Sequence, residues 1–142
     1  MTRATSAVLG MLLALPACVA FAQESGHAHA AQTEKLGTVH FATSCNQAVQ
    51  PQFDRAVALL HSFEFGASIR GFNDVLAADS TCAMAYWGLA LSRWGNPMAA
   101  GNRPPALLQE GGQWAAHGAR LAAGATDRER GYLSAVSQLY DG

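Results

Sequence analysis

Five side chains in the first half of the sequence could bind a metal ion or take part in redox chemistry. His27 and His29 alternate near the start, and His40, Cys45 and His61 follow at wider intervals. Two imidazoles close to a free amine could hold copper or zinc, although two histidines without further fixed ligands make a weak site. One hypothesis is therefore a metal- or redox-linked module of an enzyme system of the cell envelope.

No constellation typical of an enzyme active site occurs in the sequence. It contains no glycine-rich phosphate loop, no His-Glu-x-x-His and no Cys-x-x-Cys. His61 and Ser62 are adjacent, but neighbouring residues of a helix do not face each other. The charge balance of 9 basic against 10 acidic side chains, without a basic patch, argues against binding to nucleic acid. We predict a non-catalytic protein with no cofactor.

The first 22 residues have the features of an export signal. Arg3 is followed by a short apolar run over residues 7–15, which is too short to span a bilayer. The sequence Ala-Phe-Ala at positions 20–22 is typical of signal-peptide cleavage. We predict an exported, periplasmic or secreted protein whose mature chain begins at Gln23 and has no transmembrane segment. Alternatively, residues 15–18 form a lipobox that would leave Cys18 lipidated.

Residues 23–44 form the next segment. They are rich in Ala, Gln, Thr, Gly and Ser and show no helical periodicity. Residues 38–41 favour a β-strand, but one short strand without a partner does not make a sheet. We predict a flexible lead-in.

The remaining chain, residues 45–142, predicts an all-α domain of about five helices. Apolar residues recur there at steps of three and four, as on one face of a helix. Ser80 and Gly95 are a candidate start and end signal, and Thr126 with Glu129 forms a capping-box pattern. The predicted helices cover residues 46–65, 67–78, 81–94 and 105–123, and a fifth begins near residue 127.

Three of these helices share one pattern of residues. Steps of 34 and then 45 positions align aromatic with aromatic, alanine with alanine and apolar with apolar. A fixed period of this kind indicates a repeat architecture. The aligned sets are Phe53, Trp87 and Tyr132; Ala56, Ala90 and Ala135; Val57, Leu91 and Val136; and Leu60, Trp94 and Leu139.

This register resembles the tetratricopeptide repeat, whose period is 34 residues. The stretches Leu60-His61-Ser62-Phe63, residues 82–88 and Asn96-Pro97 also look like a group of secreted bacterial tetratricopeptide proteins of unassigned function. The resemblance covers Leu36 to the end and implies a solenoid of helical hairpins. Members of that group are longer, so it also implies an N-terminal piece; a fifth helix that caps the array is the alternative.

The resemblance further implies a binding surface, because the first helices of such repeats line a concave groove. The mixture of apolar and polar side chains there suits a protein or peptide partner better than a charged ligand. For Met84 and Trp87, packing in the core is the alternative, and His61 could instead be a histidine bonded to a neighbouring loop. The residues expected along the groove are Gln50, Asp54, Val57, His61, Met84, Trp87 and Leu91.

The two cysteines that remain after cleavage are expected to pair. In stacked hairpins the first helices of successive repeats lie side by side, so positions one period apart are neighbours. Cys45 and Cys82 are 37 residues apart, three more than the period, and an irregular start to the first helix can absorb the difference. An exported protein meets an oxidising environment. We predict a Cys45–Cys82 disulfide; two free thiols, with Cys45 open to a metal, are the alternative.

Overall fold

The computed structural model describes residues 36–99, 101 and 103–141, and within them all regular structure is helical, with no strand. The predicted all-α class is confirmed. The predicted signal peptide, Cys18, His27 and His29 lie outside the described residues. The helices are α1 (Gln50–His61), α2 (Phe65–Ala78), α3 (Ala83–Trp94), α4 (Pro105–Leu121) and α5 (Asp127–Gln138), with 3-10 turns at Gln47–Val49 and Ala122–Gly124.

The ends of α1 differ from the prediction at both sides. Its start is preceded by the 3-10 turn, where the Asn46 side chain accepts a hydrogen bond from the N–H of Ala48 at 2.9 Å. Pro51 then occupies the first turn of α1, where a missing N–H leaves no bond unmade. The helix ends at His61, four residues earlier than predicted, because Phe63 adopts a left-handed conformation with φ of 61°.

The predicted cap at Ser80 is wrong. Helix α3 begins at Ala83, and its N-cap position is Cys82, which makes no side-chain capping bond. The preceding turn is closed instead by Asp79, whose carboxylate accepts bonds from the N–H and hydroxyl of Thr81 at 3.1 and 2.7 Å. The predicted turn at Gly95 is confirmed, with φ of 76°.

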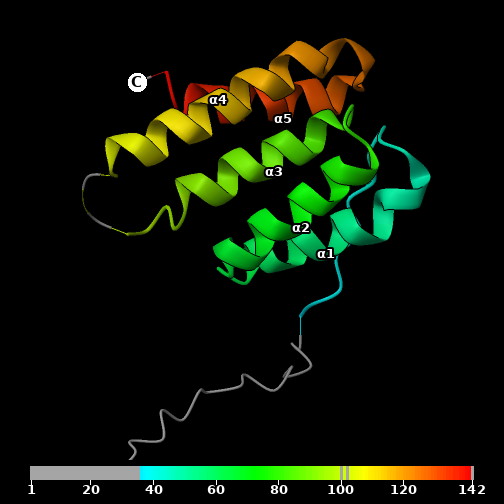
Figure 1. Ribbon diagram of the computed structural model, residues 1–142, viewed down its shortest axis with the longest axis horizontal. Coiled ribbons are helices and arrows are strands. Elements are labelled where there is room, and N and C mark those ends of the chain that lie inside the picture. The colour runs from blue at the N-terminus through cyan, green and yellow to red at the C-terminus, as the bar shows by residue number, and fades with distance from the viewer. Residues whose placement is uncertain (1–35, 100, 102, 142) are drawn as a thin grey trace, which may run out of the picture. The chain divides into compact units, whose positions relative to one another are not determined.

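Each helix packs against the next one along the chain, and α1, α3 and α5 also contact one another in succession. Figure 1 shows α3 between the pair α1 and α2 and the pair α4 and α5. A connection of only three residues, 62–64, joins α1 to α2, as in a helical hairpin. None of the described helices is long and apolar enough to cross a membrane.

Small residues let the helices approach closely. Gly88 of α3 lies against the fully buried ring of Phe72 from α2, and a Cβ atom there would be 2.2 Å from its Cζ atom. Gly118 of α4 similarly faces Leu133 of α5. In α5 the alanine of the repeated pattern, Ala135, is exposed, because α5 packs against the core through Leu133 and Val136.

Candidate functional site

Residues 36–45, which we call the strap, are not a free linker. They have no regular secondary structure, yet Val39 and Phe41 pack against the core of the helices. Side chains of α1 and α5 also bind the strap backbone. The predicted flexible lead-in is therefore wrong for residues 36–44, because apolar packing and hydrogen bonds hold them on the helices.

Phe41 anchors the strap in a box of aromatic rings. Its ring centroid lies 5.9 Å from that of Phe53, 5.5 Å from that of Trp87 and 5.2 Å from that of Tyr132. The guanidinium of Arg128 lies over the same ring, 5.0 Å from the centroid. One ring from each of α1, α3 and α5 thus contacts a single side chain, an arrangement that adds directional aromatic attraction to the burial.

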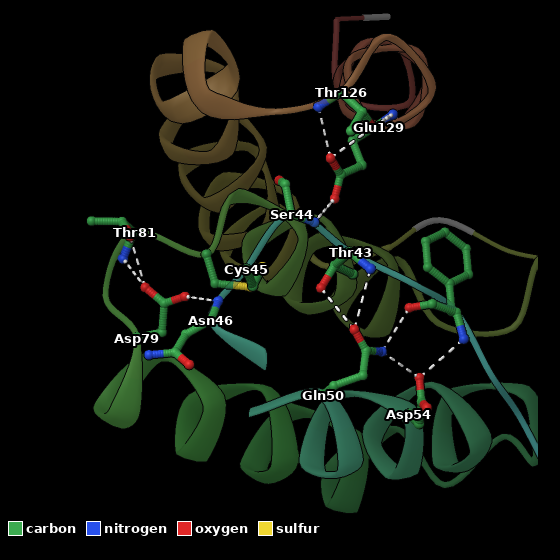
Figure 2. The surroundings of a disulfide bond; sticks show 12 residues. Thr43, Ser44, Cys45, Asn46, Gln50, Asp54, Asp79, Thr81, Thr126 and Glu129 are labelled. Atoms are coloured by element: carbon green, nitrogen blue, oxygen red, sulfur yellow. Dashed lines mark hydrogen bonds between the residues drawn. A yellow bond between two sulfur atoms is a disulfide. The ribbon is translucent and has the colours of Figure 1, made fainter. Parts of the chain in front are cut away.

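Side chains of α1 bind the strap backbone on both sides of this anchor (Figure 2). The Gln50 amide donates to the carbonyl of Phe41 at 2.9 Å, and the Asp54 carboxylate accepts from the N–H of Phe41 at 3.0 Å. The Gln50 carbonyl oxygen accepts from the N–H of Thr43 at 3.2 Å, and His40 contacts Asp54 at 3.1 Å. These bonds satisfy strap backbone groups that pair with no neighbouring strand.

Helix α5 binds the strap from the other side. The fully buried Glu129 accepts a bond from the N–H of Ser44 at 2.7 Å with one oxygen, and from the N–H of Thr126 at 2.7 Å with the other (Figure 2). Arg128 donates to the carbonyl of Ala42. The predicted capping box of Thr126 and Glu129 is confirmed. Its carboxylate therefore both caps α5 and holds the strap.

Both carboxylates that hold the strap have lowered pKa values. Burial by itself would raise the pKa of Asp54, but hydrogen bonds, first among them that from the N–H of Phe41, outweigh it and lower the pKa. Burial would likewise raise the pKa of Glu129, and the bonds from the N–H groups of Ser44 and Thr126 bring it below its ordinary value. Each group therefore binds its proton less readily in the folded chain than in the unfolded chain.

We expect the fold to lose stability in acid, and Glu129→Gln to reduce that loss. A carboxylate with a lowered pKa stabilises the fold above its unfolded pKa, near 4.5 for Glu129, and this contribution disappears as the pH falls through the folded value. The amide does not titrate, so the free energy of unfolding of the variant should fall less steeply below that pH. At neutral pH the variant should lose about 1–2 kcal/mol, because one partly buried N–H, of Ser44 or Thr126, loses its acceptor. Urea unfolding at a series of pH values measures both effects, and parallel pH profiles for the two proteins would contradict the assignment.

The strap ends at a disulfide between Cys45 and Cys82, the pair predicted from the sequence. The N–H of Asn46 donates to the Asp79 carboxylate at 2.8 Å, so the next residue is tied to the same turn before α3. That bond and those from Thr81 lower the pKa of Asp79. The C-terminal end of the strap is thus covalently fixed to the start of α3.

Five of the seven residues expected along an open groove are not free to line one. Gln50 and Asp54 bind the strap, and the strap's aromatic ring stacks on Trp87. Val57 and Met84 are buried in the core, so the expectation that they face a partner is wrong. Their apolar side chains complete the packing between the helices. The repeat pattern by itself does not distinguish such core positions from positions that face a groove.

The other two, His61 and Leu91, lie beside an open pocket of about 320 Å³, which we call the Phe63 pocket. It is formed where α1 and α3 end, together with the loop after each of them, the first residue of α2 and the residue that follows α5. Most of its lining is aromatic or aliphatic. The lining residues are Leu60, His61, Phe63, Phe65, Leu91, Trp94, Gly95, Pro97 and Leu139.

The candidate metal ligands are not brought to one place. His40 contacts a carboxylate of α1, Cys45 is in the disulfide and His61 is at the Phe63 pocket. Among the described residues, one group of three potential ligands lies close together, and it consists of the two cysteines and Asp79. Its sulfur atoms are bonded to each other, so they cannot act as thiolate ligands in this state.

Sequence reasoning missed three features of this site. These are the role of Phe41 as the anchor of the strap, the position of Phe63 at the pocket, and the bond between Glu129 and the strap. A signal for Phe41 existed, because the β-prone residues 38–41 lie shortly before Cys45, and its disulfide brings this part of the chain close to the start of α3. No comparable signal marks Phe63, whose importance arises from its backbone conformation.

The strap is therefore held on α1, α3 and α5 by two kinds of contact, polar bonds to its backbone and packing of an aromatic side chain. Amide, carboxylate and guanidinium groups bind backbone N–H and C=O groups of the strap, and an aromatic box takes one side chain. Comparison with protein-family models, with curated proteins and with solved structures finds no match to this chain.

Proposed function

We propose that this chain is an exported, non-catalytic helical-repeat scaffold that binds an extended segment of a protein or peptide on the face formed by α1, α3 and α5. One observation carries the proposal: that face already holds an extended segment, the strap, through an aromatic anchor and side-chain bonds to its backbone. Backbone recognition of this kind accepts many sequences, whereas the aromatic box selects one side chain.

The proposal includes a tetratricopeptide-like arrangement of the helices. Phe53, Trp87 and Tyr132 are the aromatic residues that the repeat register aligns, and all three contact the ring of Phe41. Aligned positions of three helices therefore lie around one point, as expected when equivalent helices of successive repeats are neighbours. This supports the repeat reading, which remains a proposal.

Export is the other part of the proposal. A disulfide between the two cysteines of the mature chain suits an oxidising compartment outside the cytoplasm. We expect mass spectrometry of the protein recovered from cells to find an N-terminus at Gln23. An intact Met1 would contradict this, and a lipidated Cys18 would make the protein membrane-anchored.

Selection of short random peptides on the mature, oxidised chain tests the binding function. We expect enriched peptides to contain an aromatic residue and to shift the amide NMR signals of α1, α3 and α5 more than those of α2 and α4. A scrambled version of each enriched peptide that places its aromatic residue elsewhere is the control, and it should bind more weakly. Failure to enrich any peptide, or shifts confined to α2 and α4, would overturn the proposal.

A further inference from the structure

Phe63 occupies a backbone position that favours glycine. The N–H of Phe63 bonds to the carbonyl of Leu60 at 3.1 Å, and the N–H of Glu64 bonds to that of Leu59 at 3.0 Å. These two bonds define the Schellman motif that ends many helices, whose left-handed residue is usually glycine. Phe63 has φ of 61°, and a side chain in this conformation is strained by its Cβ atom.

Burial does not compensate for this strain. The Phe63 side chain is 59% exposed, and its ring contact is an edge-on one with Phe65, at 5.9 Å between centroids. Strained residues that persist without a packing reason concentrate at ligand-binding sites. Phe63 lines the pocket, where a ligand could bury its ring.

The Phe63 pocket continues the surface that holds the strap. Leu60, Trp94 and Leu139 line it, and each lies seven residues after one of the three rings around Phe41. Seven residues are two helical turns, so these side chains lie on the same helix faces, about 10 Å further along. The strap does not cover them, because its first residues pass over the side of α1 near Arg55.

We propose that the Phe63 pocket receives an aromatic side chain from an extended segment of a partner protein, and that Phe63 contacts the inserted ring. The inference rests on the proposed function, and it identifies the Phe63 pocket as the part of the binding face that receives the partner's aromatic side chain. An extended polypeptide is favoured over a small apolar molecule because the neighbouring part of the same surface holds one in the strap. About three residues of extended chain span the distance from the Phe41 box to the pocket. The aromatic class follows from the rings of Phe63, Phe65 and Trp94, which offer edge and face contacts.

The variant Phe63→Gly distinguishes a role of Phe63 in peptide binding from a role in the stability of the fold. Glycine adopts the left-handed conformation without strain, so the variant should keep or raise its melting temperature. We expect its affinity for an aromatic peptide to fall at least about tenfold, as for loss of a central aromatic contact. Phe63→Asn, which also tolerates this conformation, should behave in the same way. Leu107→Ala removes an exposed apolar side chain of α4 and should leave affinity unchanged.

The probes are a capped Gly/Ser peptide with one central phenylalanine, the same peptide with alanine, and decanoate. NMR titration of the mature chain should show the phenylalanine peptide shifting amides of residues 60–65 and 91–97, and the alanine peptide shifting none of them. Shifts there with decanoate but not with the phenylalanine peptide would overturn the proposal in favour of a small apolar ligand. The absence of any such shift up to the solubility of the peptide would also overturn it. If peptides from the random selection bind Phe63→Gly as tightly as the unchanged chain, the scaffold function stands and the pocket assignment fails.

Discussion

Replacing Cys45 and Cys82 together by alanine should lower the free energy of unfolding by about 4 kcal/mol. The disulfide closes a loop with a sequence separation of 37, and in the chain-entropy model a loop of that length restricts the unfolded chain by this amount. The bond also fixes the end of the strap, which is otherwise held by the packing of Val39 and Phe41 and by hydrogen bonds. Urea unfolding of the oxidised chain and of the double variant measures the difference.

Reduction provides the control for this experiment. A reductant should bring the stability of the unchanged chain close to that of the double variant, and it should have no effect on the double variant. Two free thiols that can be alkylated in the oxidised protein would contradict the disulfide. A difference below about 1 kcal/mol would instead mean that the unfolded chain keeps these residues close without the bond.

Gly88→Ala should destabilise the fold by about 2–3 kcal/mol. The new methyl group would lie 2.2 Å from the Phe72 ring, which is fully buried and packs edge-on against Phe53 at 5.5 Å between centroids. A ring enclosed in this way cannot move aside cheaply, so overpacking exceeds the gain of up to about 1 kcal/mol that alanine brings within a helix. Thermal and urea unfolding measure the loss.

Gly131→Ala is the matched control, since it makes the same change within α5 at a position where a Cβ atom meets nothing within 4 Å. Helix propensity alone predicts a gain of up to about 1 kcal/mol there. The two substitutions should therefore have opposite signs. Equal changes in the free energy of unfolding would show that α2 and α3 pack less closely at Gly88 than the structure indicates.

The strap and the Phe63 pocket divide the face of α1, α3 and α5 into an occupied and an open part. The strap provides Phe41 at high local concentration because it belongs to the same chain. A partner segment that competed for the aromatic box would therefore bind weakly, whereas no strap residue in the described part of the chain lines the pocket two turns away. This is the physical reason to look for a partner at the pocket first.

Local sequence determined the helices and several of their ends. Apolar periodicity placed the first four, because each helix must bury one face whatever its neighbours are, and the capping box with the repeated residue pattern placed the fifth. Gly95 and the pair Thr126 and Glu129 marked boundaries correctly, since these signals act within one turn. The pairing of Cys45 with Cys82 was also predicted, because the resemblance to a helical repeat implied that positions about one period apart are neighbours.

Tertiary structure alone decided which of those surfaces is accessible. Val57, Met84 and Trp87 follow the same helical period as a groove face, yet two are buried in the core and the strap covers the third. Period identifies the apolar side of a helix but cannot say whether another helix, a strap or solvent lies against it. Phe63 shows the same limit in the backbone, because its left-handed conformation arises from the way α1 must end to let α2 turn back. Phe63 lines the open pocket, whose other residues come from α1, α2, α3 and the chain after α3 and α5, segments that only folding brings together.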